Sequence, residues 1–97
     1  MIRQGDLLFV PCDSIPADAV ADPSGVIARG EATGHAHRLQ LAKGRLLLFA
    51  AGVAYIKAQY KATVDHEEHG AVVLPPGNYQ VKIQREYEPA GWRQVQD

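Results

Sequence analysis

The chain has 97 residues, of which 46% are hydrophobic and 22% are charged, with ten basic residues against eleven acidic ones. This composition is typical of one folded globular domain, and it argues against an intrinsically disordered chain. The near-zero net charge argues against a surface for nucleic acid or anionic membranes. A low content of charged residues also favours self-association, so we consider homo-oligomer formation.

The cysteine count and the hydropathy pattern indicate the compartment. Cys12 is the one cysteine, so an internal disulfide is excluded and a reducing environment is favoured. No apolar run reaches the roughly 18 residues of a membrane span, and the first residues lack the pattern of a signal peptide. We therefore expect a cytoplasmic protein without membrane contact, in which Cys12 is a small, partly buried thiol.

The first half of the chain alternates short apolar runs with loops. Residues 7–10 form a continuous apolar run, which predicts a strand buried on both faces. A loop follows over 11–23, with at most one helical turn over 17–21. Further strands are expected over 26–33 and 35–41.

The second half continues in the same way. Its expected strands cover residues 46–50, 53–58, 60–65, 71–74 and 79–87, and glycine-containing turns separate all of them except the second and third. Pro76 and Gly77 suit the central positions of a type II turn before the last of these strands. Seven or eight short strands and no convincing helix predict an all-β fold, a small antiparallel barrel or sandwich. We expect one domain over residues 1–97, with 89–97 as an extended C-terminal tail docked through Trp92.

The four histidines occur as two close pairs. His35 and His37 stand two residues apart in an expected strand, so both imidazoles project from one face, together with apolar residues. His66 and His69 stand three apart, so one tight turn brings them to one side. The two pairs therefore have the spacing to meet.

A metal would explain two neighbouring imidazoles on an inward face, since neutral imidazole is a preferred nitrogen ligand and buried polar groups need partners. Together His35, His37, His66 and His69 suit a divalent transition metal. We place zinc first, with iron, manganese, nickel or copper as alternatives. The competing interpretation is structural, with the four imidazoles as satisfied core or surface groups.

Carboxylates accompany the second pair. Glu67 and Glu68 lie between His66 and His69, and either one is a candidate ligand or a catalytic general base acting on metal-bound water. The spacing differs from the zincin H-E-x-x-H, and two solvated turn carboxylates are the alternative interpretation. Glu31 is a further candidate for holding an imidazole in position.

The run Gly34-His35-Ala36-His37, with a later histidine pair and a Pro-Pro-Gly turn, resembles the cupins in the logic of its site. Cupins are small β-barrels that bind a metal through H-x-H, a glutamate a few residues on, and a later histidine. The resemblance implies a cupin-like β-barrel with His35, His37 and one of the later histidines as ligands. Leu41 and Ala42 stand where the family has its glutamate.

Two functions follow from these patterns. In the first, the metal activates water or an oxygen of a small-molecule substrate, with Glu67 or Glu68 as acid/base. In the second, the protein is a non-catalytic binding or assembly module, with structural or interfacial histidines. There the strand over 79–87 pairs with a partner.

Overall fold

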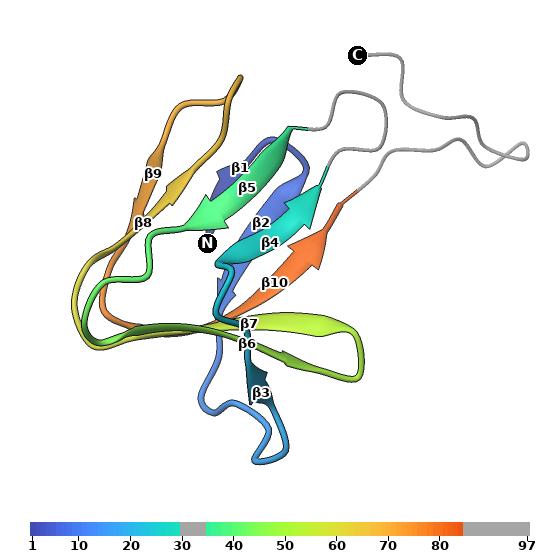
Figure 1. Ribbon diagram of the computed structural model, residues 1–97, viewed down its shortest axis with the longest axis vertical. Coiled ribbons are helices and arrows are strands. Elements are labelled where there is room, and N and C mark those ends of the chain that lie inside the picture. The colour runs from blue at the N-terminus through green and yellow to red at the C-terminus, as the bar shows by residue number, and fades with distance from the viewer. Residues whose placement is uncertain (30–34, 85–97) are drawn as a thin grey trace, which may run out of the picture.

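The computed structural model describes residues 1–29 and 35–84, and these residues form ten β-strands and no helix (Figure 1). The strands, in chain order, are β1 (Ile2–Gln4), β2 (Leu7–Pro11), β3 (Val20–Ala21), β4 (Val26–Arg29), β5 (Ala36–Leu39), β6 (Arg45–Ala50), β7 (Val53–Ala58), β8 (Ala62–Asp65), β9 (Val72–Leu74) and β10 (Gly77–Ile83). Within these described ranges, no helix is long and apolar enough to cross a membrane.

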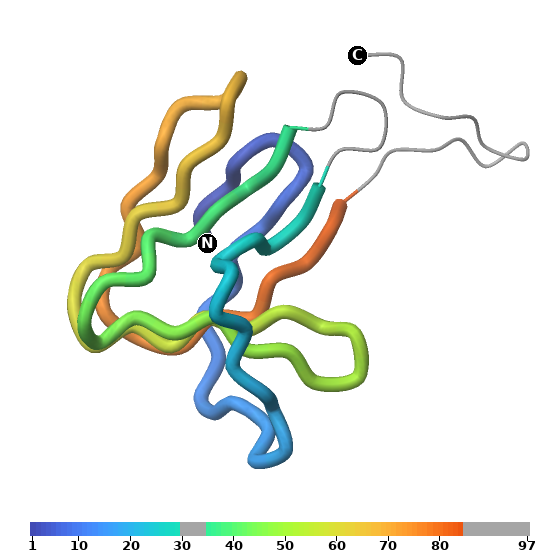
Figure 2. Tube along the Cα trace, viewed as in Figure 1, coloured from blue at the N-terminus to red at the C-terminus, as the bar shows by residue number. Residues whose placement is uncertain are grey.

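The strands make two antiparallel sheets. One has six strands in the order β1-β2-β10-β7-β6-β3, and the other has four in the order β4-β5-β8-β9. The trace passes between the sheets four times, after β3, β5, β7 and β9 (Figure 2). The all-β, antiparallel prediction is confirmed in its sandwich form, because the described strands leave open edges and do not close into a barrel.

The core lies between the two sheets and follows the period-two pattern of the sequence. Leu7 and Phe9 on β2 are fully buried, as are Leu47 on β6 and Ile56 on β7. Val64 on β8 and Leu74 on β9 are likewise buried. Burying each large side chain contributes about 2 kcal/mol. The expectation that residues 7–10 are buried on both faces is wrong, because Leu8 and Val10 are only partly covered.

Several expected elements differ from the observed ones. The sequence prediction missed β1 and β3, and β3 occupies part of the segment for which a helical turn was considered. Gly77 does not take the type II turn conformation, because its φ is 150° and it already pairs with Ala58 as the first residue of β10. The turn is held instead by the Tyr79 hydroxyl, which donates to the Pro75 carbonyl at 2.6 Å.

The strand over 79–87, which the sequence suggested as a pairing site for a partner, is β10 in its described part. β10 pairs with β2 over Tyr79–Ile83 and with β7 over Gly77–Gln80, so it lies inside its sheet. Among the strands that the structure describes, the outer ones of the two sheets are β1, β3, β4 and β9. Glu31, Tyr87, Trp92 and the tail over 89–97 lie outside the described residues.

Candidate metal centre

The pairing of β5 with β8 brings the two histidine pairs together. Arg38 pairs with Asp65, and Leu39 pairs with Val64. In this antiparallel register the chain that leaves β8 runs back along the beginning of β5, so His66 arrives beside His37. The start of β5, the β8–β9 loop and the β1–β2 turn lie at the same end of the molecule (Figure 1).

His66 stands at the centre of the cluster. Its ring centroid lies 4.3 Å from that of His37, 4.7 Å from that of His69 and 5.8 Å from that of His35. The rings of His37 and His69 are nearly parallel, with centroids 6.3 Å apart. The two pairs predicted from the sequence therefore form one cluster, which we call the histidine corner (His35, His37, His66 and His69).

Gln4 fixes the tautomer of His37. Both amide hydrogens of Gln4 are used, because its Nε2 donates to the backbone carbonyls of Val64 and Gly70, each at 2.9 Å. The Gln4 Oε1 is thus an acceptor, and it lies 2.8 Å from Nδ1 of His37. His37 must donate from Nδ1, which leaves a lone pair on Nε2 of the neutral ring. Gln4 and His37 are only 2% and 5% exposed, so this arrangement is well shielded from water.

The environment keeps His37 neutral. Burial, and after it the neighbouring His66 and His69, lower the pKa of His37 from its ordinary 6.5 to about 4, against the opposing effect of Asp6 and Glu67. The Asp6 Oδ1 lies 3.8 Å from Nε2 of His37, too far for a direct hydrogen bond. The lone pair on Nε2 is therefore available at neutral pH.

His66 has the opposite tautomer. Its Nδ1 accepts the backbone N–H groups of Glu68 at 3.0 Å and of His69 at 3.1 Å. A ring nitrogen that accepts two hydrogen bonds carries no proton, so the proton of neutral His66 is on Nε2. Here the imidazole caps a tight turn in the way that asparagine or aspartate side chains commonly do.

The two glutamates differ in what they contact. Glu67 accepts the backbone N–H of Ala36 at 2.9 Å and pairs with Arg38 at 3.0 Å. These hydrogen bonds lower the pKa of Glu67 to about 2, so its carboxylate ties the β8–β9 loop to β5 and is a weak base. Glu68 is exposed, and its Oε2 lies 3.5 Å from Nδ1 of His35.

Gly5 makes room for His69. It is the first residue of the two-residue turn between β1 and β2, and its φ of 60° fits a type II′ turn. A Cβ at this position would lie 2.7 Å from Nε2 of His69 and 3.5 Å from Cε1 of His37. A side chain here would therefore push His69 out of place.

Sequence reasoning missed Gln4, Gly5 and Asp6 as parts of the corner. A Gly-Asp dipeptide between apolar runs is a known signal of a two-residue hairpin, so the turn itself was predictable. That this turn covers the histidines was not, because it depends on how β1 packs beside β9 in the other sheet.

The potential metal ligands at the histidine corner do not converge on one position in this structure. In the part of the chain that the structure describes, no group of three or more histidine, cysteine, aspartate or glutamate side chains is placed to hold a metal ion as it stands. The rings lie close together, but short distances between ring centroids do not mean that the nitrogen lone pairs point toward one common position. The exposed His69 would have to turn its ring for the corner to close around an ion.

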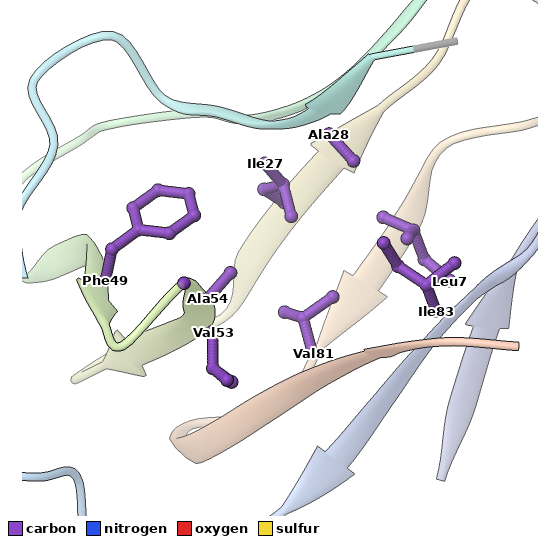
Figure 3. A pocket seen from close by; sticks show the side chains of 9 residues that line it. Leu7, Ile27, Ala28, Phe49, Val53, Ala54, Val81 and Ile83 are labelled. Atoms are coloured by element: carbon purple, nitrogen blue, oxygen red, sulfur yellow. The ribbon is translucent and has the colours of Figure 1, made fainter. Parts of the chain in front are cut away.

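A second concave feature lies away from the histidines. It is a hollow of about 240 Å³ between the sheets, lined by the apolar residues Leu7, Ile27, Ala28, Phe49, Gly52, Val53, Ala54, Val81 and Ile83 (Figure 3). None of the residues that line this hollow has a polar side chain, so it offers no side-chain ligand or base for chemistry.

A family model described as "Domain of unknown function (DUF8820)" matches residues 3–84. No curated protein and no solved structure matches the chain.

Proposed function

The chain belongs to this family, whose description names no activity, so we propose from the geometry that the protein binds one divalent transition metal ion at the histidine corner. The observation that carries the proposal is the convergence of four imidazoles, with ring centroids 4.3 to 6.3 Å apart, from two separate segments. Zinc is the first candidate, with iron, manganese, nickel or copper as alternatives, because all of them accept imidazole ligands.

The state of His37 supports the proposal. A metal needs neutral imidazole, and burial holds His37 in that form at neutral pH. The hydrogen bond from Nδ1 to Gln4 orients the ring, and its Nε2 lies 3.8 Å from Oδ1 of Asp6. Metal-binding histidines commonly have such a partner on their other ring nitrogen.

If the bound metal is catalytic, it would activate water or an oxygen of a small-molecule substrate. Glu68 is then the better candidate for the general base, since it is exposed and not tied to the backbone. Glu67 is held ionised by Ala36 and Arg38, which suits it to positioning the loop. We further propose a cytoplasmic setting, which the single free Cys12 supports.

The alternative function is a non-catalytic binding or assembly module. Two observations favour it. His66 caps the β8–β9 turn and His37 is hydrogen-bonded to Gln4, so both histidines have structural roles that need no metal. In that case the protein folds and acts without a metal, and any partner strand would pair at an open sheet edge, such as β3 or β9, where Val20 and Val73 are exposed.

Elemental analysis of the purified, untagged protein by mass spectrometry tests the proposal. About one metal ion per chain is the expected result, and about one half would indicate a site shared in a homo-oligomer. The variant His35→Ala/His37→Ala should lose the metal, while Gln40→Ala on the neighbouring exposed surface should keep it. No metal in the purified protein, even after reconstitution, would favour the assembly module.

A further inference from the structure

The β1–β2 turn contributes a carboxylate to the histidine corner. Asp6 follows Gly5 in this turn, and its Oδ1 lies 3.8 Å from Nε2 of His37. Two donors on one tetrahedral zinc ion are separated by about 3.3 Å, since each bond measures about 2.0 Å. The observed separation is within about half an ångström of that value, so a small movement of Asp6 would let both atoms bind one ion.

His69 lies against the same turn. Its Nε2 and the Cε1 of His37 both face the space in which a side chain on Gly5 would stand. The backbone of Gly5 thus lies next to both His37 and His69, and Asp6 is the following residue of the same turn. His69 is exposed, and the side chain of Asp6 is 53% exposed, so the site opens to water on this side.

His66 is unsuited to binding the ion although it stands at the centre of the cluster. A histidine ligand binds through one nitrogen and keeps its proton on the other. His66 accepts two backbone N–H groups at Nδ1, so its proton is on Nε2 and neither nitrogen offers a lone pair. Ligation by His66 would require either the loss of these hydrogen bonds or the loss of the remaining proton.

His35 lies at the edge of the cluster. Its ring is 5.8 Å from that of His66, on the side of Glu68, whose carboxylate is 3.5 Å from its Nδ1.

We infer that His37, His69 and Asp6 are the residues that hold the metal, while His66 caps the turn that presents His69. This inference rests on the proposed function and adds a ligand, Asp6, from a part of the chain that carries no histidine. Two histidines and one carboxylate leave positions open on the ion, as in non-haem iron(II) and catalytic zinc sites. The ligand set therefore favours a centre that takes up water or a substrate oxygen over a closed structural one.

Zinc titration in competition with a chromophoric chelator tests the ligand set in four single variants. Asp6→Asn and His69→Asn should each weaken Zn²⁺ binding by about tenfold or more, because each removes a ligand. His66→Asn should leave the affinity within about threefold, since an asparagine Oδ1 caps the same turn. His35→Asn should likewise stay within about threefold, because the inferred ligand set does not include His35.

The outcomes separate the two proposals. If the unaltered chain binds Zn²⁺ but Asp6→Asn binds it equally well, or His66→Asn loses it, the inferred ligand set is wrong and the proposed function stands. If the unaltered chain binds no Zn²⁺, the proposed function fails and the ligand set with it. Nitrogen-15 NMR of the metal-free protein checks the tautomers independently: His37 should be protonated at Nδ1 and His66 at Nε2, and the reverse for His66 would overturn its assignment as a cap.

Discussion

Two hairpin turns of this protein have the same length and very different surroundings. The β1–β2 turn consists of Gly5 and Asp6, and the β6–β7 turn consists of Ala51 and Gly52. At Gly5 an added Cβ would run into His69, whereas at Gly52 it would meet nothing within 4 Å. Both turns satisfy the local rules of a two-residue hairpin, but only the first also packs against the histidine corner. Local sequence thus specifies the turn, and tertiary packing decides what the turn is used for.

The largest expected effect is at Gln4, which joins the first turn to the corner. Gln4→Leu should lower the free energy of unfolding by about 3 kcal/mol, because it leaves the buried Nδ1–H of His37 and two backbone carbonyls without their partner. Urea denaturation measures this change. Gln40→Leu is the matched control, since its hydrogen bond to Asp65 is exposed, and it should cost less than about 0.5 kcal/mol. Equal losses in the two variants would contradict the assigned role of Gln4.

Acid should weaken the corner before it affects the rest of the protein. The folded-state pKa of His37 is about 4 and its ordinary value is 6.5, so the unfolded chain takes up the proton first. The contribution of neutral His37 to the stability of the metal-free protein is therefore complete above about pH 6.5. It should be lost as the pH falls to about 4, by roughly 2 to 3 kcal/mol.

Denaturation at a series of pH values measures this loss. His37→Gln should remove the dependence between pH 6.5 and 4. The contribution of Glu67, whose pKa falls from 4.5 to about 2, is lost only at lower pH. A flat profile between pH 6.5 and 4 in the unaltered chain would show that His37 is not held neutral.

The two glycines test the comparison directly. Gly52→Ala should cost about 1 kcal/mol, because alanine is strained at a φ of 78° but has free space. Gly5→Ala should cost about 2 kcal/mol or more, because the first position of a type II′ turn strains alanine strongly and the His69 ring must also move. Adding His69→Ala to Gly5→Ala should restore part of the loss. If both glycine variants lose the same amount, the first turn is no more crowded than the second.

The smallest expected effect is a gain at the open turn. Ala51 has a φ of 50°, a conformation that asparagine adopts more easily than alanine. Ala51→Asn creates the Asn-Gly pair preferred in this type of hairpin and should raise the free energy of unfolding by about 0.5 kcal/mol. Thermal denaturation measures the gain, and zinc affinity should not change. A loss of stability would show that Ala51 makes contacts that asparagine disrupts.

The strands were the most predictable part of the molecule. Alternation in β7 and in β10 follows the burial of Ile56, Tyr79 and Val81, because a sheet with one covered face imposes a period of two on its sequence. The spacing of His35 and His37 likewise pointed to a shared site. The position of Gln4 was not predictable, since one polar residue in a three-residue strand has no period, and its partners lie 60 and 66 residues further along the chain. The tautomers of His37 and His66 depend on such distant and local hydrogen bonds and follow only from the structure.

The hydrogen bonds of Gln4 also bear on the order of folding. They close the two longest loops in the corner, and contacts between residues so far apart in the sequence form slowly because the intervening chain must first be ordered. β5 and β8 can pair earlier, before β1 covers His37. Only the docking of β1 then excludes water from His37 and orients its ring. We therefore expect the corner to form late in folding. Metal binding at His37 would then show that β1 has docked against the β8–β9 loop.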